Sequence, residues 1–129
     1  MGRILVVEDD DAVRAFVLRA LSLDGHAVDS AEDGEVGFDR LQEAVAQHRG
    51  YDLMLSDIKM PFMDGIELAG HAATIAPDMP VMLMTGYADQ RERAESVKAI
   101  DVILKPFTLA EIRKATATIL QRADQRLAG

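Results

Sequence analysis

Several short apolar runs of this chain end on residues that carry carboxylates, a hydroxyl or an amine. The runs cover 4–7, 53–56, 81–84 and 102–104, and the residues that follow them are Glu8, Asp9 and Asp10, then Asp57, then Thr85 and Gly86, then Lys105 and Pro106. If the runs are parallel strands, their carboxyl ends meet at one edge of a sheet. The acids, the hydroxyl and the amine would then supply the parts of a phosphoryl-transfer site.

The acids are suited to hold a divalent cation. Asp9 and Asp57 offer hard oxygen ligands, which suit Mg²⁺ because this ion binds few carboxylates and keeps several waters. Glu8 would reach the same ion through a water. Carboxylates placed close together repel one another, and a bound cation relieves that repulsion. We therefore predict Mg²⁺ as the cofactor.

The remaining groups are suited to handle a phosphoryl group. Asp57 is the carboxylate that we expect to act as the nucleophile, forming an acyl phosphate. The Lys105 ammonium would neutralise charge on the phosphoryl oxygens, and the Thr85 hydroxyl would donate to one of them. Each residue alone has an ordinary alternative, because Asp is common in turns and Thr is common in strands. The conjunction of all of them favours the chemical role.

The apolar pattern predicts five consecutive strand–helix units. The run at 4–7 is continuous, which is typical of a parallel strand covered on both faces. Thr108 and Glu111 form a capping box at the start of the last helix. The helix at 90–99 is charged and has few apolar anchors beyond Ala94 and Val97. The expected strands are 3–8, 26–30, 51–57, 80–85 and 101–104, and the expected helices are 11–23, 34–47, 66–75, 90–99 and 108–121.

Length and composition set bounds on the architecture. A chain of 129 residues with 49% hydrophobic content is long enough for one sizeable core and too short for two, so we expect a single domain over 1–129 with its core at about 3–121 and the end of the last helix at 122–129. The net charge of −8 argues against a nucleic-acid partner. The absence of Cys, and a start that runs directly into a short strand, predict a cytoplasmic protein without a signal peptide or membrane span.

The ordered motifs resemble the receiver domain of two-component response regulators. Residues 4–10 read ILVVEDD, residues 55–65 read LSDIKMPFMDG, residues 85–86 read TG and residues 105–107 read KPF. The resemblance covers essentially the whole chain. It implies an α/β fold of the flavodoxin-like, CheY-like type, which is a (βα)5 three-layer sandwich around a five-stranded parallel sheet of order 2-1-3-4-5.

This resemblance implies roles for the acidic residues. Asp57 would accept the phosphoryl group from a phosphohistidine, and a histidine kinase or histidine phosphotransferase would be the donor. Glu8 and Asp9, together with Asp57, would hold Mg²⁺. Lys59 would contribute its backbone carbonyl to the same ion.

On the phosphoryl side, the resemblance implies contacts from Thr85 and Lys105 and a cis peptide bond between Lys105 and Pro106. The chain would take part only in its own phosphorylation and dephosphorylation and would not be an enzyme for external substrates.

An alternative from another class is a Mg²⁺-dependent aspartyl phosphohydrolase. Such enzymes commonly carry a second Asp two residues after the nucleophile, where this chain has Lys59.

The switch residues depart from the usual receiver pattern. Many receivers carry an aromatic residue three positions before the Lys, and that ring moves inward together with the Thr that corresponds to Thr85. This chain has Val102 at that position. Tyr87 is a candidate replacement, and a surface Tyr on a turn is the alternative interpretation. Tyr87 would also hinder the water that hydrolyses the acyl phosphate, so we predict a long-lived phosphorylated form.

The expected output is a protein–protein interaction. A helix with few buried anchors shifts at low free-energy cost, so the helix at 90–99 is suited to respond to a change at Thr85. We predict that the downstream partner binds the face formed by 90–99, 101–104 and 108–121. The chain would then act as a stand-alone regulator with no direct contact to nucleic acid or membrane.

A narrower resemblance points to CpdR-like regulators. It rests on 64–69, 84–87 and 105–109, which read DGIELA, MTGY and KPFTL. It implies phosphate arriving from a hybrid kinase through a histidine phosphotransferase, and output as control of a protease adaptor in cell-cycle proteolysis. A chemotaxis-type motor regulator and a passive phosphate sink remain alternatives, and the intact acid set disfavours a module that signals without phosphate.

Overall fold

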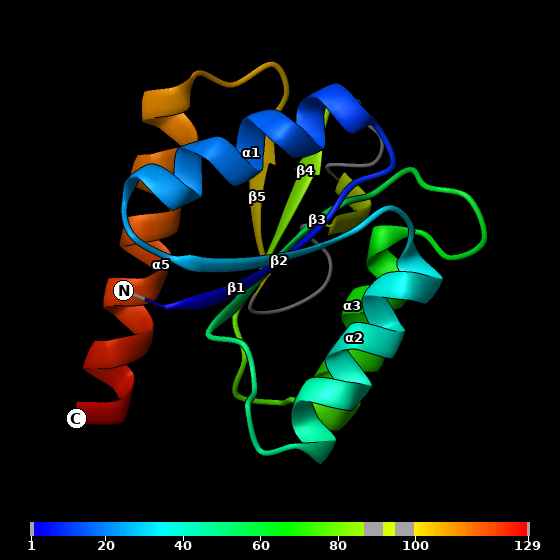
Figure 1. Cartoon of the computed structure of the whole chain (residues 1–129), viewed down its shortest axis with the longest axis vertical. Helices are drawn as coiled ribbons and strands as arrows, with labels where there is room; N and C mark the ends of the chain where they lie inside the picture. Colours follow the sequence, from blue (N-terminus) through cyan, green and yellow to red (C-terminus); the bar gives the residue numbers. More distant parts are fainter. Residues whose placement is uncertain (1, 87–91, 95–99, 129) are drawn as a thin grey trace.

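Five parallel strands form the centre of the molecule (Figure 1). The structure is a computed structural model, and it describes residues 2–86, 92–94 and 100–128. The strands lie in the order β2-β1-β3-β4-β5. Their bounds are Arg3–Val7 for β1, Ala27–Ala31 for β2, Leu53–Asp57 for β3, Val81–Thr85 for β4 and Ile100–Leu104 for β5. The predicted parallel sheet and its strand order are therefore confirmed.

Helices cover both faces of the sheet. Helices α1 and α5 lie on one face, and α2 and α3 lie on the other (Figure 1). Their bounds are Asp11–Leu23 for α1, Gly34–Ala46 for α2, Gly65–Ile75 for α3 and Leu109–Ala128 for α5. This arrangement is the predicted flavodoxin-like three-layer sandwich.

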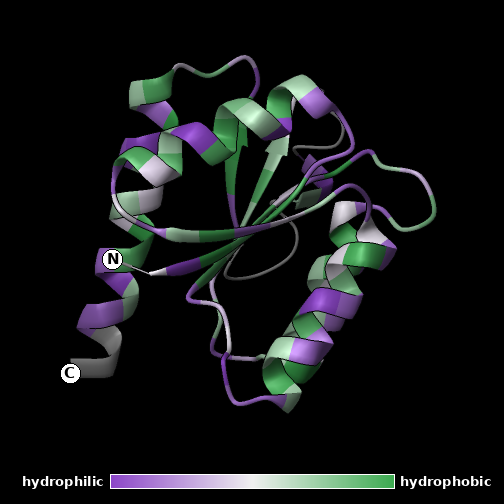
Figure 2. Cartoon of the chain, in the orientation of Figure 1, coloured by the Kyte–Doolittle hydropathy of each residue, from purple (hydrophilic) through white to green (hydrophobic). Residues whose placement is uncertain are grey.

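Alternate residues of each strand pack into two separate cores. In β1, Ile4 and Val6 pack with α1 and α5, whereas Leu5 and Val7 pack with α2 and α3, and all four side chains are fully buried. Figure 2 shows largely hydrophobic strands in the middle of the molecule and helices that carry both hydrophobic and hydrophilic residues. Successive strand residues point to opposite faces, so a continuous apolar run buries itself on both sides.

The helix ends follow local capping chemistry. Asp10 accepts hydrogen bonds from the amides of Ala12 and Val13 at 2.9 and 3.0 Å and so caps α1. At the start of α5 the amide of Glu111 donates to Thr108 Oγ1 at 3.0 Å, and the amide of Thr108 donates to Glu111 Oε1 at 2.9 Å. The predicted capping box is confirmed.

The bounds of the strands and helices lie within two residues of the predicted ones, except at the end of α5. Helix α5 continues to Ala128 and not to 121, because 122–128 contain no Gly or Pro and consist of residues compatible with a helix. Of the helix predicted at 90–99, residues 92–94 are helical and Ala94 is buried. The rest of that prediction, including Val97, lies outside the described residues.

Candidate functional site

The predicted chemical residues all lie at the carboxyl edge of the sheet. Glu8 and Asp9 directly follow β1, Asp57 is the last residue of β3, and β1 and β3 are hydrogen-bonded neighbours. Thr85 ends β4, the next strand along, and Lys105 directly follows β5. Residues far apart in sequence therefore converge because every strand points the same way.

Three carboxylates form one cluster at this edge. One oxygen each from Glu8, Asp9 and Asp57 lies within 4.8 Å of the others. The Glu8 side chain is fully buried and Asp57 is 9% exposed, whereas Asp9 is exposed. The set fits Mg²⁺, because it provides hard oxygen ligands on one side and leaves the solvent side open for the waters that this ion retains.

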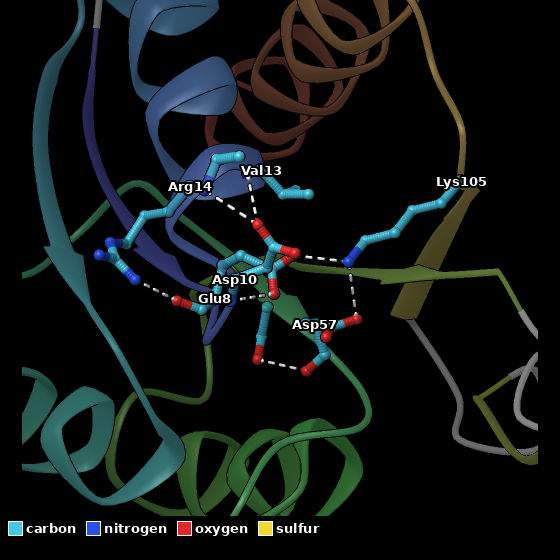
Figure 3. A network of polar contacts seen from close by, with 8 residues as sticks. Glu8, Asp10, Val13, Arg14, Asp57 and Lys105 are labelled. Atoms are coloured by element: carbon cyan, nitrogen blue, oxygen red, sulfur yellow. Dashed lines mark hydrogen bonds and ion pairs between the residues drawn. The ribbon is translucent and has the colours of Figure 1, made fainter.

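The Lys105 ammonium joins two of these carboxylates. Its Nζ lies 2.5 Å from Glu8 Oε1 and 3.2 Å from Asp57 Oδ1. Figure 3 shows the side chain reaching from the end of β5 to both acids. A cation in this position compensates buried negative charge that would otherwise be costly.

Burial and charge shift the proton affinities of these groups. Burial raises the pKa of the Glu8 carboxyl to about 7, although the hydrogen bond from Lys105 opposes this rise. Burial also raises the pKa of Asp57 against the opposing effect of Lys105. For Lys105 itself burial lowers the pKa, but the hydrogen bond to Glu8 and the two negative charges outweigh burial and raise it.

Helix α1 supports the loop that carries Glu8. The Arg14 guanidinium donates to the Glu8 carbonyl oxygen at 2.8 Å (Figure 3). It also pairs with Asp11 at 2.5 Å. The Asp10 amide donates to Glu8 Oε2 at 3.2 Å. The sequence analysis missed Arg14. Its spacing of three residues from Asp11 predicts a helical ion pair, but not the contact with the backbone of Glu8.

A glycine supports the backbone of Asp57. A Cβ placed on Gly65 would lie 2.1 Å from the Asp57 carbonyl oxygen, so only glycine allows this approach of α3 to β3. The Gly65 amide donates to the Ile58 carbonyl at 2.8 Å, and Ser56 Oγ donates to the Asp57 carbonyl at 2.8 Å. These contacts fix the strand end that presents the Asp57 carboxylate.

The other predicted site residues differ in their surroundings. Thr85 is buried, and its carbonyl accepts from the Lys105 amide at 2.8 Å. Lys59 lies in the loop after β3 with an exposed side chain. Val102 is partly buried against the core beneath α2 and α3. Tyr87, the candidate switch aromatic, lies outside the described residues.

The Lys105–Pro106 peptide bond is cis, as the resemblance implied.

Most of the chain matches one known protein family. The family described as the response regulator receiver domain matches residues 4–117. The chain belongs to this family. Receiver domains are generally phosphorylated on an aspartate and generally bind Mg²⁺ at an acidic pocket.

Two relatives differ in how much of their length resembles this receiver. The response regulator receiver protein CpdR of Brucella abortus is 40% identical over 114 residues, which cover 87% of this receiver and 91% of CpdR. The response regulator MprA of Mycobacterium sp. strain KMS is 34% identical over 124 residues, or 95% of this receiver and 52% of MprA. The receiver thus spans about half the length of MprA and nearly all of CpdR.

Solved structures share the fold of this receiver. The receiver domain of the hybrid histidine kinase CckA has a TM-score of 0.78 and 32% identity, covering 92% of this receiver and 99% of that chain. The chemotaxis response regulator CheY4 of Vibrio cholerae has a TM-score of 0.81 and 24% identity, covering 92% and 98%, which is a likeness of fold alone. Within the described residues, none of the helices has the length and apolar character needed to cross a bilayer.

Proposed function

We propose that this receiver acts in a response regulator and accepts a phosphoryl group on Asp57 from a phosphohistidine. One observation carries the proposal. The Asp57 carboxylate lies at the carboxyl edge of the sheet between an ammonium at 3.2 Å and two further acids whose oxygens lie within 4.8 Å. A nucleophile, a cation for the phosphoryl oxygens and a set of metal ligands are therefore adjacent.

In the proposed reaction an oxygen of Asp57 forms a bond to phosphorus while the P–N bond of phosphohistidine breaks. The leaving imidazole nitrogen takes the electron pair of that bond. Lys105 would move from bridging Glu8 and Asp57 to contact the phosphoryl oxygens, and the Thr85 hydroxyl would donate to one of them. The same residues would serve hydrolysis of the acyl phosphate, with no turnover of an external substrate.

Glu8, Asp9, Asp57 and the backbone carbonyl of Lys59 are the groups that would hold Mg²⁺. When bound, the ion supplies positive charge that offsets the carboxylates and the phosphoryl oxygens. The acid cluster supports this proposal, because its oxygens match the ligand preference of Mg²⁺ and one acid faces solvent.

For the output, we propose a phosphorylation-dependent protein contact in the cytoplasm on the face that includes β5 and α5. A groove of about 390 Å³ lies between these elements and is lined by charged side chains of both signs, including Asp101, Lys114 and Arg122. The 40% sequence identity to CpdR, over 91% of its length, supports a CpdR-like role, for which the resemblance in sequence implies control of proteolysis. A motor regulator and a phosphate sink are the competing outputs.

The test of the acceptor is the intact mass after incubation with Mg²⁺ and acetyl phosphate. We expect the wild-type chain to gain one phosphoryl group and Asp57→Asn to gain none. Asp39→Asn, which changes an exposed acid on α2, should gain the group normally. A phosphoryl group retained by Asp57→Asn would refute the assignment.

The output is tested by partner capture with phosphorylated and unphosphorylated protein. A regulator should bind a downstream protein in only one of the two forms, whereas a sink should bind only its phosphodonor. Release of phosphate from an external phosphoester at many turnovers per protein would instead support the aspartyl phosphohydrolase.

A further inference from the structure

The loop between β3 and α3 contains a backbone conformation that is unusual for its residue. Phe62 has φ 71°, in the left-handed region that favours glycine. The Met63 amide donates to the Pro61 carbonyl at 2.8 Å, which closes a tight turn of three residues around Phe62. A turn of this kind with positive φ at its centre is rare and strained. Such outliers are found preferentially at functional sites.

The side chains of this turn divide between the core and the solvent. Met60 is 9% exposed, and Met63 packs against the core that lies beneath α2 and α3. Phe62, in contrast, is 77% exposed, the highest value among the large hydrophobic residues that the structure describes as exposed. The two methionines anchor the loop, and the strained turn directs an aromatic ring into water. The ring is therefore not part of the folded core.

The same loop is attached to the phosphoacceptor. It begins directly after Asp57 and ends where the Gly65 amide donates to the Ile58 carbonyl at 2.8 Å. At that end Gly65 lies so close to the strand that an added Cβ would be 2.1 Å from the Asp57 carbonyl oxygen. Phe62 therefore lies five residues after Asp57, in the loop that leads directly out of the site. We expect a protein that brings a phosphoryl group to Asp57 to come close to this loop.

A second apolar surface borders the site through Lys105. A groove of about 490 Å³ is lined by Val13 and Phe16 of α1 together with Lys105, Pro106 and Phe107. Its Lys105 is the residue that contacts Asp57 at 3.2 Å. Apolar surface thus borders the site at Lys105, and the loop that follows Asp57 carries a second exposed apolar side chain, Phe62. A partner surface that extends from the groove to this loop would bury both.

We propose that Phe62 is an apolar anchor for the protein that carries the phosphohistidine. The inference rests on the proposed function of Asp57 and adds a recognition residue to it. A large aromatic side chain buried at the centre of an interface is the type of residue that dominates binding energy. The strained turn pre-orders the ring, so less freedom is lost when the donor binds. The partner surface would present apolar side chains around its histidine.

The experiment compares two phosphodonors on one set of variants. The protein donor is a histidine-phosphotransfer domain, charged by its own kinase and shown to phosphorylate the wild-type chain, and the small donor is acetyl phosphate. Phe62→Asn removes the ring and introduces a residue that tolerates the positive φ of this position. Phe62→Leu keeps an apolar side chain. Leu23→Asn is the matched control, because Leu23 is 56% exposed at the end of α1, on the edge of the sheet opposite to Asp57.

For Phe62→Asn we expect the half-saturating concentration of the protein donor to rise by about tenfold, with an unchanged maximal rate. The rate with acetyl phosphate and the melting temperature should not fall. Phe62→Leu should recover most of the loss, and Leu23→Asn should behave as wild type.

Two results would overturn the proposal. One is unchanged transfer from the protein donor to Phe62→Asn. The other is an equal loss with both donors, which would mean that Phe62 acts on the Asp57 chemistry itself. If no histidine-phosphotransfer domain can be found that phosphorylates the wild-type chain, and acetyl phosphate does not label it either, the proposed function itself is refuted, so the two failures are distinguishable.

Discussion

Glu8 and Lys105 lie 97 residues apart in the sequence and form an ion pair of 2.5 Å between Oε1 and Nζ. The Glu8 side chain is fully buried, and that of Lys105 is 23% exposed. The pair connects the loop after β1 to the end of β5, across the strand that carries Asp57. The ammonium therefore offsets two acids in the unphosphorylated protein, and its charge is available at the place where phosphoryl oxygens would arrive.

Replacing Lys105 by Met should destabilise the fold. The substitution keeps the length of the side chain but leaves Glu8 and Asp57 without their cation. Removing one partner of a buried ion pair costs about 3–5 kcal/mol, and the 23% exposure of Lys105 places the expected cost at the lower end. We expect the loss in the free energy of unfolding to be larger at about pH 8 than at about pH 5.5, because Glu8 is ionised only at the higher pH. Urea denaturation at both pH values measures it.

The control for this experiment is Lys114→Met, which changes an exposed lysine on α5. Its effect should be small and independent of pH. An equal loss for both variants, or a loss for Lys105→Met that does not depend on pH, would contradict the role assigned to the ammonium.

Stabilisation by Mg²⁺ should depend on pH through Glu8. Burial raises the pKa of this carboxyl from 4.5 to about 7, so the folded protein binds more protons than the unfolded chain between these values. The contribution of Glu8 to stability is therefore lost as pH rises through this window, and the raised pKa of Asp57 acts in the same direction. Mg²⁺ requires the ionised carboxylates and should restore stability mainly above about pH 7.

The measurement is the rise in melting temperature caused by saturating Mg²⁺ at about pH 5.5 and at about pH 8. We expect a small rise at the lower pH and a large rise at the higher one. Glu8→Gln should lose most of this pH dependence because the amide does not titrate. A rise of equal size at both pH values in the wild-type chain would count against Glu8 as the titrating group.

Two glycines of α3 should respond in opposite ways to the same substitution. At Gly65 a Cβ would lie 2.1 Å from the Asp57 carbonyl oxygen, whereas at Gly70 nothing lies within 4 Å of it. Gly65→Ala should destabilise the fold by about 2 kcal/mol or more, as expected for a steric conflict in a well-packed site. Gly70→Ala should stabilise it by about 0.5–1 kcal/mol, because alanine restricts the unfolded chain and favours a helix.

Thermal denaturation of the two variants tests this contrast, and acetyl phosphate labelling adds a second readout. Gly65→Ala should also slow labelling of Asp57, because the strand end has to shift, and Gly70→Ala should label normally. Equal stability of the two variants would show that the close approach at Gly65 is relieved without cost.

Local patterns in the sequence determined the elements and much of the site. The continuous apolar run before Glu8 indicated a strand buried on both faces, and Thr108 with Glu111 marked the start of α5. The strand order was implied by the resemblance to receiver domains. The convergence of Glu8, Asp57 and Lys105 was predictable from the pattern itself, because parallel strands place their carboxyl ends together. These features depend on residue type and spacing, which are visible without coordinates.

Tertiary structure alone decided how these residues contact one another. Three contacts could not be read from any local pattern, because they depend on how the segments pack. They are the bridge from Lys105 to two acids, the hydrogen bond from Arg14 to the Glu8 carbonyl and the close approach of Gly65 to Asp57. The shift in the pKa of Glu8 follows from burial, which is a property of the packed molecule. The exposure of Phe62 was equally hidden, because the sequence shows an apolar residue while the backbone turn directs it into solvent.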